Sequence, residues 1–226
     1  MMMKARPTMD KALKEINRKV EEMSEHIQED IRRAVSSVKE KNSALARDII
    51  DHGDVIDDME DEINADCFRF LATQAPVASD LRYCVSVMKM IRDLERMGDH
   101  CEDLAKYTMR LEDIDYECEL VDLPRMAEMA AQMVNNAIDA FLGRNLRLAR
   151  KVWKADEEVD ELYRDIFEQE MEEARRPGRA EIAISFAFIA AHLERIADYA
   201  TNICEETVFF LEGEFEIEQQ ELQPKN

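Results

Sequence analysis

The chain has 226 residues, of which 46% are hydrophobic and 36% charged, so it is long enough to bury a sizeable core. Glycine and proline number five each and methionine 14, a composition that favours long amphipathic helices and argues against a strand-rich fold. The formal net charge of −21 repels nucleic acids and anionic lipids and disfavours direct binding of a free phosphate anion. Metal ions or basic protein surfaces suit this charge better, although acidity that only maintains solubility explains it equally well.

The five cysteines are odd in number and form no CxxC pair. The N-terminus reaches charged residues quickly, without the apolar region of a signal peptide, and no apolar run reaches transmembrane length. We therefore expect a reduced, cytoplasmic protein without membrane insertion, in which cysteines serve as small core residues.

Three apolar stripes with helical spacing follow one another in the first half of the chain. The first begins near Asp10 and fades at residues 39–41, and Asn42-Ser43 then supplies a turn and an N-cap. The second is interrupted by Gly53, at a cost of about 1 kcal/mol relative to alanine. Gln74-Ala75-Pro76 breaks the helix, and the third stripe ends near Leu111.

The second half of the chain repeats this arrangement after an acidic, linker-like segment at residues 112–122. Asp122 is placed to cap a fourth helix with Pro124 in its first turn, and that stripe ends at Gly143. A fifth stripe ends at the break Arg176-Pro177-Gly178. The sixth leads into a polar tail, so the second half also predicts three helices.

Two sequence matches show that the halves are copies of one unit. Residues 41–47 return as residues 144–150, an offset of 103, and the pattern L-E-R-apolar-small-D at residues 94–99 returns 99 residues later. An internal duplication of about 100 residues with short breaks predicts an all-α fold of two tandem three-helix bundles related by a pseudo-twofold axis. The expected boundaries are residues 10–111 and 124–213, with flexible tails at 1–9 and 214–226.

The repeated motif places two carboxylates four residues apart in each half, and therefore on one helix face. Like charges at this spacing destabilise a helix slightly, so they require a reason, which is either a shared metal ion or simple solvation. The preceding helix of the second half carries Asp156 and Asp160 at the same spacing. Antiparallel packing would bring them to Glu194 and Asp198 as a patch of four carboxylates.

The equivalent patch in the first half is incomplete. Asp57 matches Asp160, but Gly53 stands where the second half has Asp156, and Asp54 is one position away. Oxygen ligands suit Mg²⁺, Mn²⁺, Ca²⁺ or iron and disfavour zinc and copper. The candidate metal ligands are Asp57, Glu95, Asp99, Asp156, Asp160, Glu194 and Asp198.

A competing interpretation is that Arg96 and Arg195, inside the same motifs, neutralise the acids in salt bridges. The four histidines show no repeat symmetry and fit surface or packing roles better than metal ligation, with His100, beside Asp99, the strongest ligand candidate among them. No glutamate is followed by histidine three residues later, which argues against a ferritin-like di-iron site. Nucleotide-binding, nucleophile-elbow and HExxH motifs are also absent from the sequence, so nothing in it favours an enzyme.

Two segments carry a recognisable pattern: residues 74–82 read QAPVASDLR, and residues 93–100 read DLERMGDH. They resemble the PhoU family of bacterial and archaeal regulators of phosphate uptake. The family typically shows Q-x-P-x-A-x-D-L-R and then E-R-I-G-D, with a second such motif in its second half. The resemblance spans residues 10–213, and Ala197 replaces the usual glycine of the second motif.

The resemblance implies a cytoplasmic negative regulator, commonly a homodimer. Such proteins are associated with the high-affinity phosphate ABC transporter, through its ATPase subunit, and with a membrane sensor histidine kinase. We therefore expect an adaptor that damps uptake and phosphate-starvation signalling when phosphate is plentiful. The alternatives are a protein that binds or stores iron and a metal-dependent phosphohydrolase.

The resemblance also implies that E/D-x-x-x-D motifs hold iron or other divalent ions, often as multinuclear clusters. The pairs Glu95/Asp99, Asp156/Asp160 and Glu194/Asp198 match these motifs, whereas Asp57 matches half of one. Many relatives have asparagine four residues after the second acid; Asn202 fits, but the first half has Asp103, which together with Glu102 is placed to compensate partly for Gly53. The expected ion is Fe, Mn, Mg or Zn, with metals that prefer oxygen favoured.

Overall fold

The computed structural model describes residues 6–74, 76–114, 116 and 122–213. These residues form six helices and no strand, so the all-α prediction is confirmed. In chain order the helices are α1 (Arg6–Glu40), α2 (Ser43–Gln74), α3 (Ala78–Arg110), α4 (Asp122–Leu142), α5 (Leu146–Glu173) and α6 (Ala180–Glu212). Helix α1 begins four residues before the predicted start, so residues 6–9, which the sequence assigned to the N-terminal tail, are helical.

The same turn joins the first two helices of each half. Lys41 and Arg144 both adopt a left-handed backbone, with φ of 51° and 52°. The side chain of Asn42 accepts a hydrogen bond from the backbone N–H of the third residue on, at 3.0 Å, and Asn145 does the same at 3.1 Å. These asparagines satisfy one of the free N–H groups at a helix N-terminus. The duplication read from the sequence is therefore a duplication of structure.

The breaks between the second and third helices also lie where they are expected. Helix α2 ends at Gln74 and α3 begins at Ala78, with Pro76 between them. In the second half Gly178 adopts a left-handed backbone with φ of 77°, which glycine tolerates without strain. The predicted linker lies largely outside the described residues, but Tyr116 within it is buried and donates a hydrogen bond to the carbonyl of Val38 at 2.9 Å.

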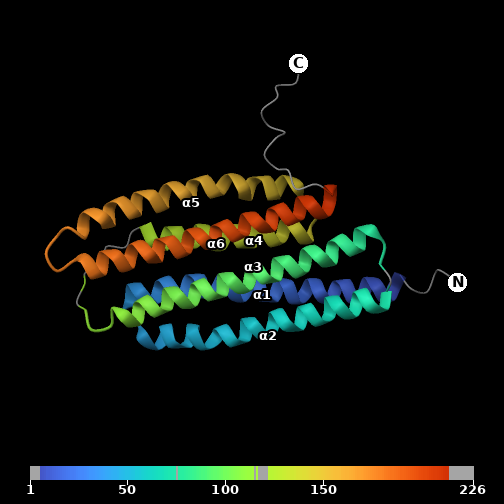
Figure 1. Ribbon diagram of the computed structural model, residues 1–226, viewed down its shortest axis with the longest axis horizontal. Helices are drawn as coiled ribbons and strands as arrows, with labels where there is room; N and C mark the ends of the chain where they lie inside the picture. The colour runs from blue at the N-terminus through green and yellow to red at the C-terminus, as the bar shows by residue number, and fades with distance from the viewer. Residues whose placement is uncertain (1–5, 75, 115, 117–121, 214–226) are drawn as a thin grey trace, which may run out of the picture.

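The two three-helix units share one core. Helices α1 and α3 of the first unit pack against α4 and α6 of the second, whereas α2 and α5 lie along the two long edges (Figure 1). The rings of Tyr83, Phe141 and Phe210 join α3, α4 and α6, with centroids 5.2–5.6 Å apart. Both units therefore contribute to a single hydrophobic cluster, which holds their relative positions.

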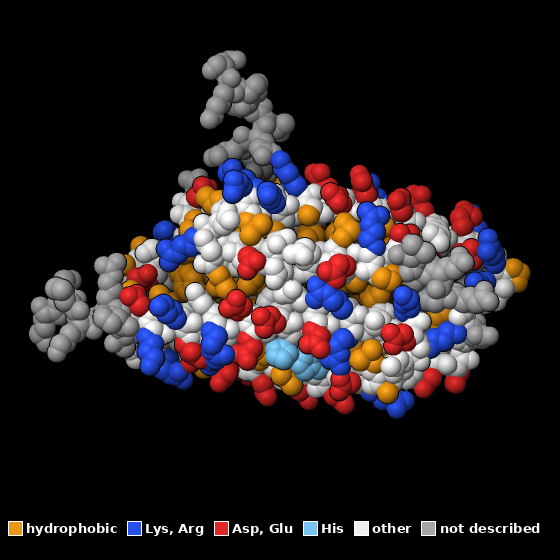
Figure 2. Space-filling view, turned by 180° about the vertical axis from the view of Figure 1, so that it is seen from behind, with side chains coloured by type: hydrophobic (Ala, Val, Ile, Leu, Met, Phe, Trp, Pro, Cys, Tyr) orange, Lys and Arg blue, Asp and Glu red, His pale blue; other side chains and the backbone are white. Residues whose placement is uncertain are grey.

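Four cysteines, Cys67, Cys84, Cys101 and Cys204, are buried and free, as expected; Cys118 lies outside the described residues. Figure 2 shows acidic and basic side chains interspersed over one face, with hydrophobic side chains between them. Among the described helices, none has an apolar stretch long enough to cross a membrane.

Candidate functional site

Four carboxylates gather between α5 and α6, which pack against each other. Asp156 and Asp160 lie on α5, and Glu194 and Asp198 lie on α6. Burial and then the negative charges of the other three carboxylates raise the pKa of Asp156 to about 7. These residues form what we call the second acidic patch, and the structure brings together all four acids that the sequence predicted there.

One oxygen of this patch lacks a partner. Oδ1 of Asp156 is buried and accepts no hydrogen bond. A buried polar atom without a partner costs free energy, about 1–3 kcal/mol in mutational data, and the neighbouring charges add repulsion. A divalent cation would supply both the missing partner and the missing positive charge. Carboxylate oxygens are the ligands that hard divalent cations prefer, so the donor types of this patch suit such an ion. Among the described residues, however, only His100, Asp103 and His192 bring three ligand atoms within 4.8 Å of one another, so the four carboxylates would have to move closer together to share one ion.

The neighbouring arginine does not neutralise this patch through an ion pair. Among the described residues, the exposed Arg195 forms no salt bridge with Glu194 or Asp198, although its charge lowers the pKa of both. Burial and the neighbouring carboxylates outweigh it, so both pKa values lie above their usual range. In the first half Arg96 lies 3.5 Å from Asp93, not beside either acid of its motif. The salt-bridge interpretation therefore does not explain these acids.

Three predicted acids of the first half also converge, between α2 and α3. Burial, followed by the charges of Asp99, Glu60 and Asp57, raises the pKa of Glu95. Burial and the charge of Asp57 raise the pKa of Asp99 as well. Glu60 was not predicted, but it lies three residues after Asp57 and thus on the same helix face, which is a signal that the sequence carries.

Gly53 explains how the first half replaces the carboxylate that it lacks. A Cβ atom built on Gly53 would overlap Oε1 of Glu102, so the glycine leaves room for a carboxylate that arrives from α3. The position of the second half equivalent to Glu102 is Thr201. Asp54 is exposed and does not contribute to the pKa shift of Glu95 or Asp99, so it is not the substitute. We call Asp57, Glu60, Glu95, Asp99 and Glu102 the first acidic patch.

A lysine already lies at the first acidic patch. Nζ of Lys106 is 3.4 Å from a carboxylate oxygen of Glu102 and 2.9 Å from one of Asp103. Its positive charge lowers the pKa of Glu102 and of Asp99, against the effect of burial. The equivalent position in the second half is Glu205. The first patch is thus partly neutralised by the protein itself.

The family model described as the PhoU domain matches residues 20–108 and residues 123–207. These two matches cover most of the chain and correspond to its two three-helix units. The chain belongs to the PhoU family. The first PhoU match contains the first acidic patch, and the second match contains the second, so each domain copy carries one patch between its second and third helices.

Relatives of known name and structure agree with this. A protein of Clostridium acetobutylicum named "Phosphate-specific transport system accessory protein PhoU homolog" is 32% identical over 210 residues, covering 92% of this chain and 96% of the relative. The crystal structure of PhoU from Pseudomonas aeruginosa is similar with a TM-score of 0.80 and 30% identity, covering 91% of this chain and 99% of that chain. The phosphate transport system regulatory protein PhoU from Streptococcus pneumoniae gives a TM-score of 0.85 and 28% identity, covering 92% and 99%.

Proposed function

We propose that this protein regulates phosphate uptake as an adaptor that binds protein components of a phosphate transport system. The observation that carries the proposal is the PhoU match over both repeat units, together with relatives named as accessory and regulatory proteins of phosphate transport. The regulation is negative, so that uptake and phosphate-starvation signalling fall when phosphate is plentiful.

The proposed partners are the ATPase subunit of a phosphate ABC transporter and a sensor histidine kinase. A net charge of −21 favours partners with basic surfaces, because complementary charge accelerates and orients association. The protein acts in the cytoplasm as a homodimer, and it acts by binding rather than by catalysis.

The two acidic patches are proposed to hold divalent metal ions that shape the adaptor surface. Asp156, Asp160, Glu194 and Asp198 would hold the ion of the second patch, and the orphaned oxygen of Asp156 supports this assignment. Asp57, Glu95 and Asp99, with Glu60 and Glu102, would hold the ion of the first. When bound, such an ion supplies positive charge that removes the repulsion between carboxylates on facing helices.

The experiment is co-purification from the native host, grown with ample and with scarce phosphate. We expect the tagged protein to recover a phosphate-transporter ATPase or a sensor kinase from ample-phosphate cells, and metal analysis of the same sample to find a divalent ion. Recovery of iron-loaded protein without either partner under both conditions would contradict the adaptor function and favour storage.

A pair of matched variants separates the metal from the adaptor role. Glu194→Gln/Asp198→Asn removes two charges from the second acidic patch, whereas Glu161→Gln/Asp165→Asn removes two exposed charges at the same spacing on α5. We expect the first variant, and not the second, to lose metal and to weaken partner recovery. Full recovery of partners by the metal-depleted variant would show that the ion is incidental to regulation.

A further inference from the structure

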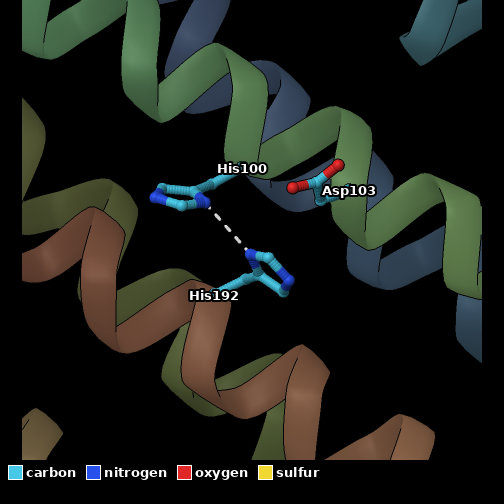
Figure 3. A group of neighbouring side chains, drawn as sticks. All are labelled: His100, Asp103 and His192. Carbon is cyan, nitrogen blue, oxygen red and sulfur yellow. Dashed lines mark hydrogen bonds between the residues drawn. The ribbon is translucent and has the colours of Figure 1, made fainter.

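Two histidines and an aspartate meet where the two PhoU units join. His100 and Asp103 lie on α3, and His192 lies on the facing α6 (Figure 3). A hydrogen bond joins the Nδ1 atoms of the two imidazoles, which are 3.0 Å apart (Figure 3). One potential ligand atom from each of the three residues lies within 4.8 Å of the others. The residues thus converge on one small volume from two halves of the chain.

The hydrogen-bonded spacing of the two imidazoles is close to the spacing that a shared metal ion requires. Nitrogen ligands lie about 2.0–2.1 Å from zinc, so two of them in a tetrahedral site are roughly 3.3 Å apart. The ring positions are held by neighbouring aromatic rings: His100 packs on Tyr199 at 5.8 Å between centroids, and His192 packs on Tyr107 at 6.0 Å. A first-row transition-metal ion would therefore need little rearrangement of the rings.

Each imidazole can offer one unprotonated nitrogen to a metal ion. In the hydrogen bond between the two Nδ1 atoms one ring donates and the other accepts, so the donor ring carries its proton on Nδ1. That proton would move to Nε2 when both Nδ1 atoms bind an ion. A surface pocket of ≈ 330 Å³, lined by Asp103, Tyr107 and His192 among others, provides access from solvent.

The duplicated fold does not require this cluster. The position equivalent to His100 is Tyr199, that of His192 is Asp93, and that of Asp103 is Asn202. In the equivalent place Asp93 instead lies 3.5 Å from Arg96. Helices α3 and α6 thus pack with two histidines at one place of their interface and with a tyrosine and an aspartate at the equivalent place. Packing alone therefore does not account for the histidine pair.

We propose that His100, His192 and Asp103 bind a first-row transition-metal ion that accepts imidazole nitrogen, such as Zn²⁺. Two nitrogen ligands and one carboxylate leave a fourth position that water from the pocket completes. Because Lys106 already lies 2.9 Å from Oδ1 of Asp103, the carboxylate binds through its other oxygen or releases the lysine. Unlike the oxygen-only patches, this site joins the two units and selects a softer metal.

The test is nuclear magnetic resonance of the full chain labelled with ¹⁵N-histidine, freed of metal and titrated with Zn²⁺. We expect the side-chain nitrogens of His100 and His192 to shift with about one equivalent of Zn²⁺, while those of His26 stay in place. If the side-chain nitrogen resonances of His100 and His192 did not shift at saturating Zn²⁺, the proposal would be overturned by the wild-type protein alone.

Variants identify the ligands in the same experiment. His100→Tyr copies the equivalent Tyr199, and His192→Asn serves as a second, independent change should the first disturb folding. Each is expected to weaken zinc binding at this site at least about tenfold, whereas His26→Gln leaves it unchanged. Zinc binding that both ligand variants retain, and that Glu194→Gln/Asp198→Asn abolishes, would place the ion in the second acidic patch and contradict the proposal.

Discussion

The two acidic patches occupy equivalent places in the two PhoU units, but they are built from different residues. The second patch takes a half-buried carboxylate from Asp156 on α5, and the residue of α6 equivalent to Glu102 is Thr201. In the first patch Gly53 stands in place of that acid, and the carboxylate of Glu102 fills the space from the opposite helix. Comparison of the two shows that a repeat preserves the location of a charge in space while the residue that supplies it moves to the neighbouring helix.

The same comparison predicts that the patches differ in affinity for metal. The second patch contains Asp156, which has a buried carboxylate oxygen without a partner and a pKa raised to about 7. The first patch already contains the ammonium group of Lys106 beside Glu102. A divalent ion therefore relieves more repulsion in the second patch, and we expect it to bind there first.

The largest expected effect is the loss of metal from the second acidic patch. Glu194→Gln/Asp198→Asn is expected to weaken Mn²⁺ binding at that patch by about a hundredfold, since two of its four charged ligands are lost. The equivalent change in the first patch, Glu95→Gln/Asp99→Asn, is expected to cost about tenfold in its own, weaker binding. Calorimetric titration of the metal-free protein measures both, and equal losses at the two sites would contradict the ranking.

Exchanging residues between the patches gives the next largest effect. Gly53→Asp/Glu102→Thr gives the first patch the arrangement of the second, and we expect Mn²⁺ to bind there about tenfold more tightly. Gly53→Asp alone forces the carboxylate of Glu102 aside because the new Cβ overlaps it, so the single variant should gain less than the double variant. If the single variant gained as much, Glu102 would not be the carboxylate that replaces Asp156.

The helices and their ends could be predicted because their signals are local. The cap at Asn42 and the break at Pro76 depend on residues that adjoin in sequence, and the structure confirms both. Helix α1 begins before the predicted start because the apolar stripe continues one turn further, to Met9, which packs against the core like Leu13.

The sites were less predictable because they depend on contacts between helices. The four acids of the second patch were found from i, i+4 spacing and antiparallel packing. The exchange of Gly53 for Glu102 required knowledge of how closely α2 approaches α3. His100 and His192 are 92 residues apart and have no counterparts in the repeat, so neither spacing nor duplication indicated that they meet.

A smaller expected effect is the dependence of stability on pH that Asp156 of the second patch causes. The folded protein holds a proton on Asp156 up to about pH 7, whereas a carboxyl group of ordinary pKa 3.8 loses it in the unfolded chain. The folded state binds more protons between these values, so this group makes metal-free protein less stable as pH rises from about 4 to 7.

Asp156→Asn removes this dependence. Between pH 5 and pH 8 we expect the Tm of the metal-free wild type to fall about 2 °C further than that of the variant. Other groups with raised pKa values, such as Glu170 and Asp93, contribute to both proteins and cancel in the difference. With saturating Mn²⁺, the extra fall in the Tm of the wild type between pH 5 and pH 8 should disappear. If the Tm of both metal-free proteins fell equally with pH, the raised pKa would not belong to Asp156.

The smallest predicted effect concerns a buried polar contact that only the first unit has. The hydroxyl of Ser37 on α1 donates to the carbonyl of Ala34 and lies 2.7 Å from the hydroxyl of Thr108 on α3. In the second unit alanine stands in place of the serine, and the equivalent Thr207 donates to the carbonyl of Ile203 in its own helix at 2.9 Å. Thr108 therefore has an acceptor of the same kind within its own helix, and Ser37→Ala should cost only about 0.5–1 kcal/mol in urea unfolding. A loss above about 2 kcal/mol would show that Thr108 stays unpaired and that the two units do not solve this contact interchangeably.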